Sequence, residues 1–111
     1  MIVPLSSPDI GQRERDLINE VLSSNILSIG PKVEQFERMV AEYLGVKEAV
    51  AVSSGTSGLH LAVRALRIGE GDEVITTPFS FIASSNCLLF ERARPVFVDI
   101  EPMTLNIDPA C

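Results

Sequence analysis

Apolar residues in the first part of the chain recur at the spacing of a helix. Two stretches show this spacing, one from Asp9 to Ser23 and one from Pro31 to Leu44. We expect Asp9 to cap the first helix, with Gln12 reaching back to it. Pro31 suits the first position of the second helix, because its missing N–H costs nothing there, and Gly45 is a natural stop. The pattern predicts two amphipathic helices joined by a loop.

The pattern changes after residue 47, where short apolar runs alternate with helical stretches. The runs are rich in β-branched residues and are expected to be strands: Glu48–Val52, Glu73–Thr77 and Pro95–Asp99. One helix is expected after residues 53–58, ending at Gly69, and another from Phe79–Phe81 to near Arg92. The first of these helices should turn four residues inward: Leu59, Ala62, Val63 and Leu66. No element is expected from Pro102 to Cys111. Strands alternating with helices of about 12 residues predict an α/β fold with parallel strands.

The composition narrows the class of protein. The 111 residues carry nine basic and fifteen acidic side chains, which argues against a nucleic-acid partner, because phosphate contacts need a basic face. No apolar run approaches the ~20 residues that span a bilayer, and the first residues do not resemble a signal peptide, so no membrane association is expected. Two cysteines are too few for a disulfide framework and lack metal-site spacing. A cytoplasmic protein with reduced thiols and no metal is the expectation.

The segment from Ser53 to Gly58 is the strongest candidate for a ligand site. In open α/β sheets, ligands bind beyond the C-terminal ends of the strands, and this segment follows the first predicted strand. Its hydroxyls and backbone N–H groups stand at the positive end of a helix, which suits a phosphate. It is neither a Walker loop nor the dinucleotide fingerprint. The alternative is a serine-rich helix cap without a ligand, and the residues alone leave the two interpretations about even.

Phe81 stands at the equivalent place after the second predicted strand. An aromatic side chain there could stack on a flat ring whose phosphate lies at the first loop. The alternative is that Phe79 and Phe81 are core residues, which the usual burial of phenylalanine favours.

The remaining reactive side chains favour structural roles. His60 is the only histidine, and no catalytic partner stands at a motif spacing from it, so we expect it to be satisfied structurally. Lys32 and Lys47 precede the first strand and are expected to be solvated, outside the site. Asp99 ends a strand and suits capping of the next turn at least as well as binding. Cys87 is expected to be a small buried residue.

Three motifs together resemble a known family. SSGTSGLHLA, GEGDEVITTPFSF and PVFVDI occur in this order within the stretch from Ala49 to Asp108. They resemble the DegT/DnrJ/EryC1/StrS sugar aminotransferases, which are pyridoxal-phosphate (PLP) enzymes of the aspartate-aminotransferase fold. The resemblance covers essentially the whole chain and implies the N-terminal part of the α/β large domain that binds PLP. Residues 1–46 would be the N-terminal helices and a substrate-side loop, and residues 47–111 the start of the sheet.

The resemblance also implies roles for individual residues. Gly55, Thr56 and Ser57 match the loop that grips the cofactor phosphate, and Phe81 matches the aromatic residue that stacks on the pyridine ring. The loop of Ser28, Gly30 and Pro31 matches one near the sugar-nucleotide pocket. The lysine that binds the cofactor covalently, and the aspartate that pairs with the pyridine nitrogen, lie further along the family's sequence. No catalytic residue is therefore expected in this chain, which should be inactive alone.

The implied activity is amino transfer in polysaccharide biosynthesis. The family commonly moves an amino group from glutamate to a keto group on a nucleotide-linked sugar. One alternative is a PLP-dependent sugar dehydratase, in which another residue replaces the lysine. A second alternative is a non-catalytic fragment or regulatory remnant with an empty phosphate loop. A homodimer or higher homo-oligomer is expected.

The resemblance raises a question about the sheet. In the family's fold the strand at Ala49–Val52 lies on one side, and Val74–Thr77 pairs with Val96–Asp99 on the far side. The strands between them come from sequence absent here. We therefore expect either that the first strand closes up against the other two, or that the edges pair with another copy of the chain. The family's dimer habit favours the second version.

Overall fold

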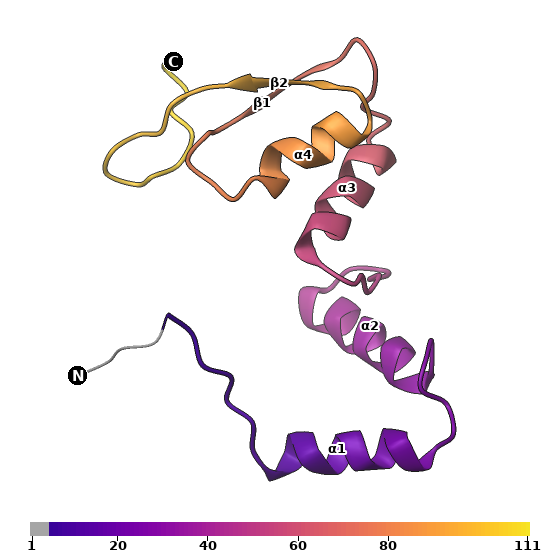
Figure 1. Ribbon diagram of the computed structural model, residues 1–111. Helices are drawn as coiled ribbons and strands as arrows, with labels where there is room; N and C mark the ends of the chain where they lie inside the picture. Colours follow the sequence, from indigo (N-terminus) through magenta and orange to yellow (C-terminus); the bar gives the residue numbers. More distant parts are fainter. Residues whose placement is uncertain (1–4) are drawn as a thin grey trace, which may run out of the picture. The chain divides into compact units, whose positions relative to one another are not determined.

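The computed structural model describes residues 5–111 (Figure 1). The chain divides into two compact units, one ending at Ala51 and the other beginning at Val52. Each unit is described by itself.

The first unit contains the two predicted helices, α1 (Gln12–Ser23) and α2 (Pro31–Leu44). The prediction for α2 is confirmed at both ends: Pro31 is its first residue, and Gly45 follows it with a left-handed φ of 65°. That φ favours glycine, because a Cβ would crowd the backbone there.

The predicted start of α1 is wrong. The helix begins at Gln12, and its N-cap is Gly11 rather than Asp9. The Gly11 N–H donates to the Glu14 carboxylate at 2.7 Å, while Gln12 donates to Asp16 instead of reaching back. A carboxylate three residues into the helix satisfies a free N–H of the first turn, and this contact outcompetes the expected cap. Hydrogen bonds from the backbone N–H groups of Glu14 itself and of Gly11 lower the pKa of Glu14.

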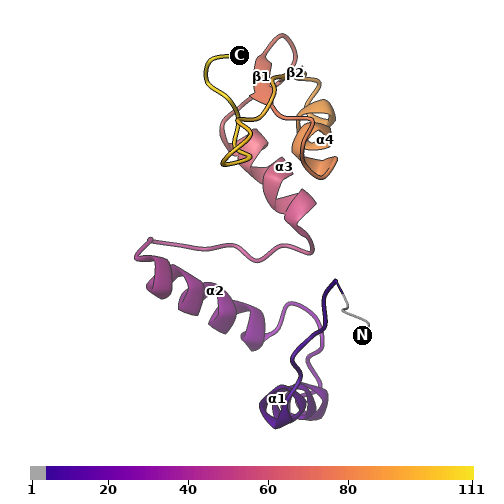
Figure 2. The ribbon, with the colours of Figure 1, turned by 90° about the vertical axis from the view of Figure 1, so that its left-hand side faces the viewer.

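The second unit contains α3 (Gly55–Ala65), β1 (Glu73–Thr76), α4 (Ala83–Phe90) and β2 (Arg94–Phe97). The two strands are parallel and lie side by side, with Glu73 opposite Arg94 and Thr76 opposite Phe97 (Figures 1 and 2). The helix α4 connects them and contacts both α3 and the strands. The α/β prediction, with β1 and β2 paired in parallel, is confirmed.

The predicted strand at Glu48–Val52 is wrong. These residues form no regular element, and Val50 is 74% exposed. A strand needs a neighbour to pair its N–H and C=O groups, and within residues 5–111 β1 pairs only with β2. One N–H of the segment is paired with a side chain instead: the Ala51 N–H donates to the Glu37 carboxylate at 2.8 Å. The segment therefore adds no strand to the sheet that the structure describes within residues 5–111, and pairing with another copy stays a prediction.

The flanking helices differ from the prediction at their ends. The helix α3 begins at Gly55, inside the expected loop, and ends at Ala65, before Gly69. The helix α4 begins at Ala83, later than Phe79–Phe81, and ends at Phe90. The Phe79 N–H donates to the Thr77 hydroxyl at 3.1 Å, which keeps this stretch in a turn.

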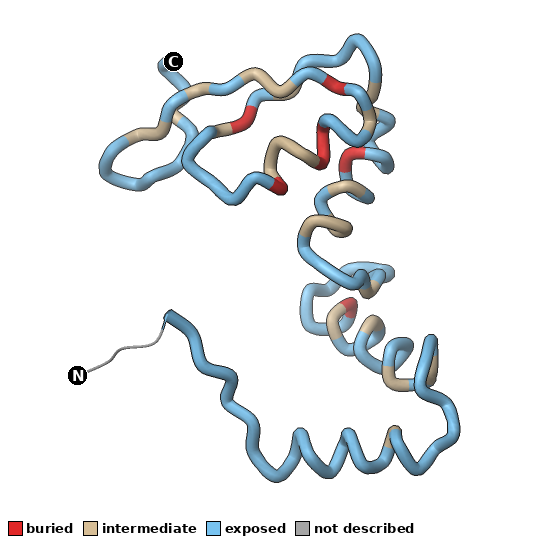
Figure 3. The backbone as a smooth tube through the Cα atoms, in the orientation of Figure 1, coloured by how far each residue is buried: buried red, intermediate tan, exposed pale blue. Residues whose placement is uncertain are grey.

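The core of the second unit is small. Its buried residues come from α3, from α4 and from the position just before β2: Val63, Cys87, Leu88 and Ala93. They gather where α3, α4 and the strands meet (Figure 3). Burial of Cys87 confirms its prediction. Of the four residues predicted to face inward from α3, only Val63 is buried, because no described element covers Leu59, Ala62 and Leu66.

The tail after β2 contains one isolated antiparallel bridge, between Ile100 and Ile107. The Glu101 carboxylate accepts hydrogen bonds from the backbone N–H groups of Met103 and Thr104 within it. These bonds lower the pKa of Glu101. The tail is otherwise irregular, in agreement with the sequence.

Candidate functional site

The N-terminus of α3 leaves two backbone donors free. Ser54 caps the helix, and its hydroxyl accepts the Ser57 N–H at 3.1 Å. The Gly58 N–H donates to the Ser54 carbonyl. The N–H groups of Gly55 and Thr56 have no acceptor among residues 5–111. Free N–H groups at the positive end of a helix dipole attract an anion such as a phosphate.

Gly55 and Thr56 line a hollow that Phe81 also lines. The hollow is lined by residues of the first turns of α3 and α4 and of the loop before α4: Gly55, Thr56, Gly58, Leu59, Phe81, Ala83 and Ser84. Phe81 is 76% exposed, and Phe79 is exposed as well. The interpretation of these phenylalanines as core residues is therefore wrong. The structure places Gly55, Thr56 and Phe81 at one hollow, although 25 positions separate Thr56 from Phe81.

Ser57 contacts the hydroxyls of neighbouring serines instead of lining the hollow. Its hydroxyl lies 3.0 Å from the Ser54 hydroxyl and 3.4 Å from that of Ser53, and the residue does not line the hollow. Ser84 lines it without having been predicted, and its hydroxyl lies 3.0 Å from that of Ser80. No local pattern signals this role of Ser84, because Ser80 lies before α4 and the i, i+4 spacing of a helix does not apply to the pair.

The hollow has the chemistry for a phosphate joined to a flat ring, as in PLP. The two free N–H groups and the Thr56 hydroxyl suit the phosphate, and the exposed ring of Phe81 offers a face for stacking. A Cβ added at Gly55 would meet no atom within 4 Å, so the space beside this backbone is open. No lysine lines the hollow. Lys47 is exposed, and Lys32 is half-exposed in an ion pair with Glu20 at 2.9 Å.

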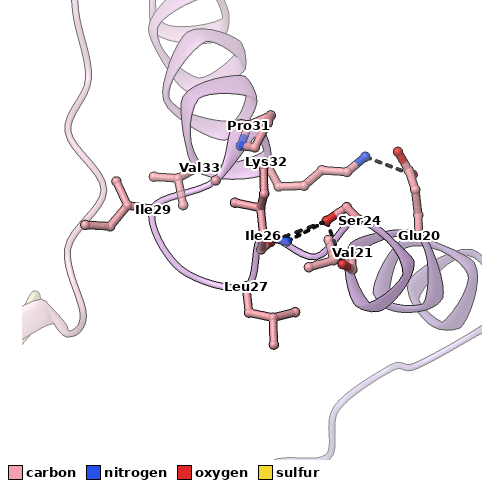
Figure 4. Close-up of a pocket in the computed structure, with 10 residues that line it drawn as sticks. Glu20, Val21, Ser24, Ile26, Leu27, Ile29, Pro31, Lys32 and Val33 are labelled. Carbon is pink, nitrogen blue, oxygen red and sulfur yellow. Dashed lines mark hydrogen bonds and ion pairs between the residues drawn. The ribbon is translucent and has the colours of Figure 1, made fainter.

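The predicted substrate-side loop lines a second, smaller pocket in the first unit (Figure 4). Gly30 and Pro31 belong to it, whereas Ser28 does not. Its other walls are Ser24 and apolar side chains of α1, of the loop and of α2, and the ion pair of Glu20 with Lys32 also belongs to the lining (Figure 4). Ile29 in this loop has a φ of 47°, a left-handed conformation that is strained for a β-branched residue.

The other singled-out residues have structural partners. His60 Nε2 lies 2.5 Å from Glu91 Oε1, which confirms that this histidine is satisfied structurally. The Asp99 carboxylate accepts the Ile100 N–H, in line with a role in the turn. Residues 5–111 hold no group of three potential metal ligands, and no helix among them is long and apolar enough to cross a bilayer.

Three curated proteins that are similar to this chain have a sugar or a polysaccharide in their names. Spore coat polysaccharide biosynthesis protein SpsC of Bacillus subtilis is 50% identical over 107 residues, 96% of this chain and 28% of its own length. GDP-perosamine synthase of Caulobacter vibrioides is 41% identical, over 97% of this chain and 29% of its own length. A dTDP-4-dehydro-2,3,6-trideoxy-D-glucose 4-aminotransferase of Saccharopolyspora spinosa is also 41% identical, over 95% of this chain and 28% of its own length. The chain thus spans less than a third of these relatives.

Solved structures with a similar fold include PLP enzymes. Spr1654 of Streptococcus pneumoniae, solved in apo, PLP and PMP forms, matches with a TM-score of 0.89 and 35% identity, over 96% of this chain and 27% of its own. A GDP-4-keto-6-deoxymannose-3-dehydratase with a trapped PLP–glutamate adduct matches with a TM-score of 0.88 and 37% identity, over 95% of this chain and 29% of its own. These matches confirm the predicted fold class and, for the relatives, the predicted cofactor.

The family comparison agrees with the relatives. The family model matches residues 8–111, which is nearly the whole sequence. This is the same family that the three sequence motifs resemble. The chain belongs to the DegT/DnrJ/EryC1/StrS aminotransferase family.

Proposed function

We propose that this chain supplies the phosphate-binding and ring-stacking residues of a PLP-dependent sugar aminotransferase. The observation that carries the proposal is the hollow, because it is lined both by Gly55 and Thr56, whose N–H groups have no acceptor among residues 5–111, and by the exposed Phe81. Ser57 contributes through its cap with Ser54, which orders the turn that presents these donors. The loop of Ser28, Gly30 and Pro31 is proposed as part of the substrate side.

The proposed reaction is amino transfer from glutamate to a keto group of a nucleotide-linked sugar. The names of the GDP-perosamine synthase and of the dTDP-sugar aminotransferase support a nucleotide-linked substrate. When bound, PLP supplies the electron sink for this chemistry. The residues of this chain bind the phosphate and hold the ring in place, and we assign the covalent lysine to sequence outside the chain. We propose a cytoplasmic homodimer or higher homo-oligomer as the working form.

A sugar dehydratase is the second candidate, supported by the similarity to the GDP-4-keto-6-deoxymannose-3-dehydratase. Both enzymes need the same phosphate site, so the hollow does not distinguish them. Amination of a nucleotide keto sugar by the full-length protein that contains this chain would favour the first. Loss of a sugar hydroxyl without amination would favour the second.

The hollow itself is tested with residues 1–111 and pyridoxamine 5′-phosphate, which lacks the aldehyde and cannot label lysines at random. We expect weak, non-covalent binding that shifts the NMR amide signals of Gly55 and Thr56 and the ring signals of Phe81. Thr56→Val should weaken binding about ten- to hundredfold, because a hydrogen bond to a charged phosphate contributes ~1.5–3 kcal/mol. Thr104→Val, in the tail, is the matched control. Unchanged signals at the hollow would contradict the proposal and favour a non-catalytic remnant.

A further inference from the structure

The second unit contains a polar cluster that the proposed function does not use. His60 Nε2 lies 2.5 Å from Glu91 Oε1, and Arg64 Nη1 lies 3.5 Å from the same oxygen. The side chains of His60 and Glu91 are only 31% and 22% exposed, whereas Arg64 is mostly in solvent. The His60 ring also meets the Phe90 ring edge-on, with centroids 5.2 Å apart. The His60–Glu91 pair therefore joins the middle of α3 to the residue that directly follows α4.

Apolar packing also holds α3 against α4, and these two helices contact each other more than any other two described elements. The buried cluster between them takes Val63 from α3 and Cys87 and Leu88 from α4, and no large side chain is fully buried within residues 5–111. Apolar burial stabilises in proportion to area and has no direction. A hydrogen bond to a carboxylate is stronger than a neutral one and requires a defined geometry. The His60–Glu91 pair is thus the main directional contact between these two helices.

The same two helices carry the hollow at their N-terminal ends. Thr56 precedes His60 by about one helical turn on α3. Phe81 stands two positions before α4, which has eight residues and a length of about 12 Å. The Ser84 N–H donates to the Phe81 carbonyl at 3.0 Å and ties Phe81 to the first turn of this short helix, so we expect a displacement of Glu91 to reach Phe81.

We propose that the His60–Glu91 pair sets the separation between the phosphate-binding end of α3 and the ring of Phe81. The inference rests on the proposed function, in which the hollow takes a phosphate joined to an aromatic ring. His60 does not line the hollow, so it acts through the two helices and is a positioning residue. A ligand that spans both ends depends on the separation, whereas a ligand bound at α3 alone does not.

The test compares two ligands of residues 1–111, pyridoxamine 5′-phosphate and inorganic phosphate. We expect His60→Ala to weaken binding of the first about three- to tenfold and to leave binding of the second within about twofold. His60→Gln, whose amide can still donate to Glu91, should restore most of the affinity. Glu91→Ala should match His60→Ala, and the double variant should bind no more weakly than either. Glu73→Gln, which alters the surface ion pair with Arg94, is the matched control.

Amide chemical shifts provide a measurement that needs no ligand. In His60→Ala the signals of Thr56 and Phe81 should move, and in His60→Gln they should return to their wild-type positions. Should His60→Ala fail to fold, Glu91→Ala serves in the same comparison. If the wild-type chain did not bind pyridoxamine 5′-phosphate, the result would count against the proposed function. The amide shifts of Thr56 and Phe81 in the variants would still test the role of the His60–Glu91 pair. Wild-type shifts at both residues in folded His60→Ala and Glu91→Ala, or equal losses for the two ligands, would overturn it.

Discussion

A substitution at Gly55 can remove one hydrogen-bond donor of the proposed phosphate site without destabilising α3. Gly55 is the first residue of α3, where proline is favoured because the N–H there has no partner in the helix. Ser54 before it is extended, with φ −162° and ψ 160°, as a residue before proline should be. Space is also available, because a Cβ at Gly55 meets nothing within 4 Å. Gly55→Pro should therefore fold as the wild type does.

The expected effects on stability and on binding have opposite signs. Replacing glycine by a compatible proline restricts the unfolded chain and should raise the free energy of unfolding by about 0.4–1 kcal/mol. The lost N–H is one of two free donors at the phosphate site. A hydrogen bond to a charged group contributes ~1.5–3 kcal/mol, and ~1.4 kcal/mol is a factor of ten in affinity. The affinity for pyridoxamine 5′-phosphate should then fall about ten- to hundredfold.

The assay pairs calorimetric titration with thermal unfolding. Gly55→Ala is the control, because it adds a Cβ and keeps the N–H. If Gly55→Pro bound pyridoxamine 5′-phosphate as well as Gly55→Ala does, the phosphate would not lie at this N–H and the reasoning would be refuted.

Three further predictions follow from features outside this donor. Phe81→Leu should weaken pyridoxamine 5′-phosphate binding by about two- to tenfold through loss of the stacking face; calorimetry should show no such loss in Phe79→Leu. Ile29→Gly should relieve left-handed strain of ~1–3 kcal/mol, offset by about 0.5–1 kcal/mol of added chain entropy, so urea unfolding should show equal or higher stability. Glu14 has a lowered pKa, so its support of α1 is complete above the ordinary glutamate pKa and lost as the pH falls through the lowered value. Carboxyl NMR should follow this titration, and Glu14→Gln should abolish the accompanying change at Gly11.

Local signals explain what the sequence could predict about the fold. The ends of α2 depend on Pro31 and Gly45, whose preferences act within one turn, and both were predicted. The start of α1 was missed because two acidic residues compete for the cap, and the choice depends on which carboxylate reaches a free N–H. The segment at Glu48–Val52 was missed for a different reason: its composition suits a strand, but strand formation depends on a partner elsewhere in the sequence.

The hollow was predictable only in part. The composition of the serine- and glycine-rich turn before α3 predicts an anion site. Phe81 looked like a core residue by composition, and only the packing of α4 against α3 leaves it exposed beside that turn. The resemblance to a family supplied the link between the two segments, because no local pattern relates Thr56 to Phe81.

The irregular segment before α3 has a consequence for how the chain can be cut. Proteases bind their substrates in an extended form and prefer exposed backbone outside regular structure. Val50, exposed and lacking a ladder partner among residues 5–111, meets these conditions and stands next to the junction of the two units at Ala51 and Val52. Cleavage next to Val50 would therefore release α1 with α2 as one fragment. The other fragment would keep α3, both strands and the entire hollow.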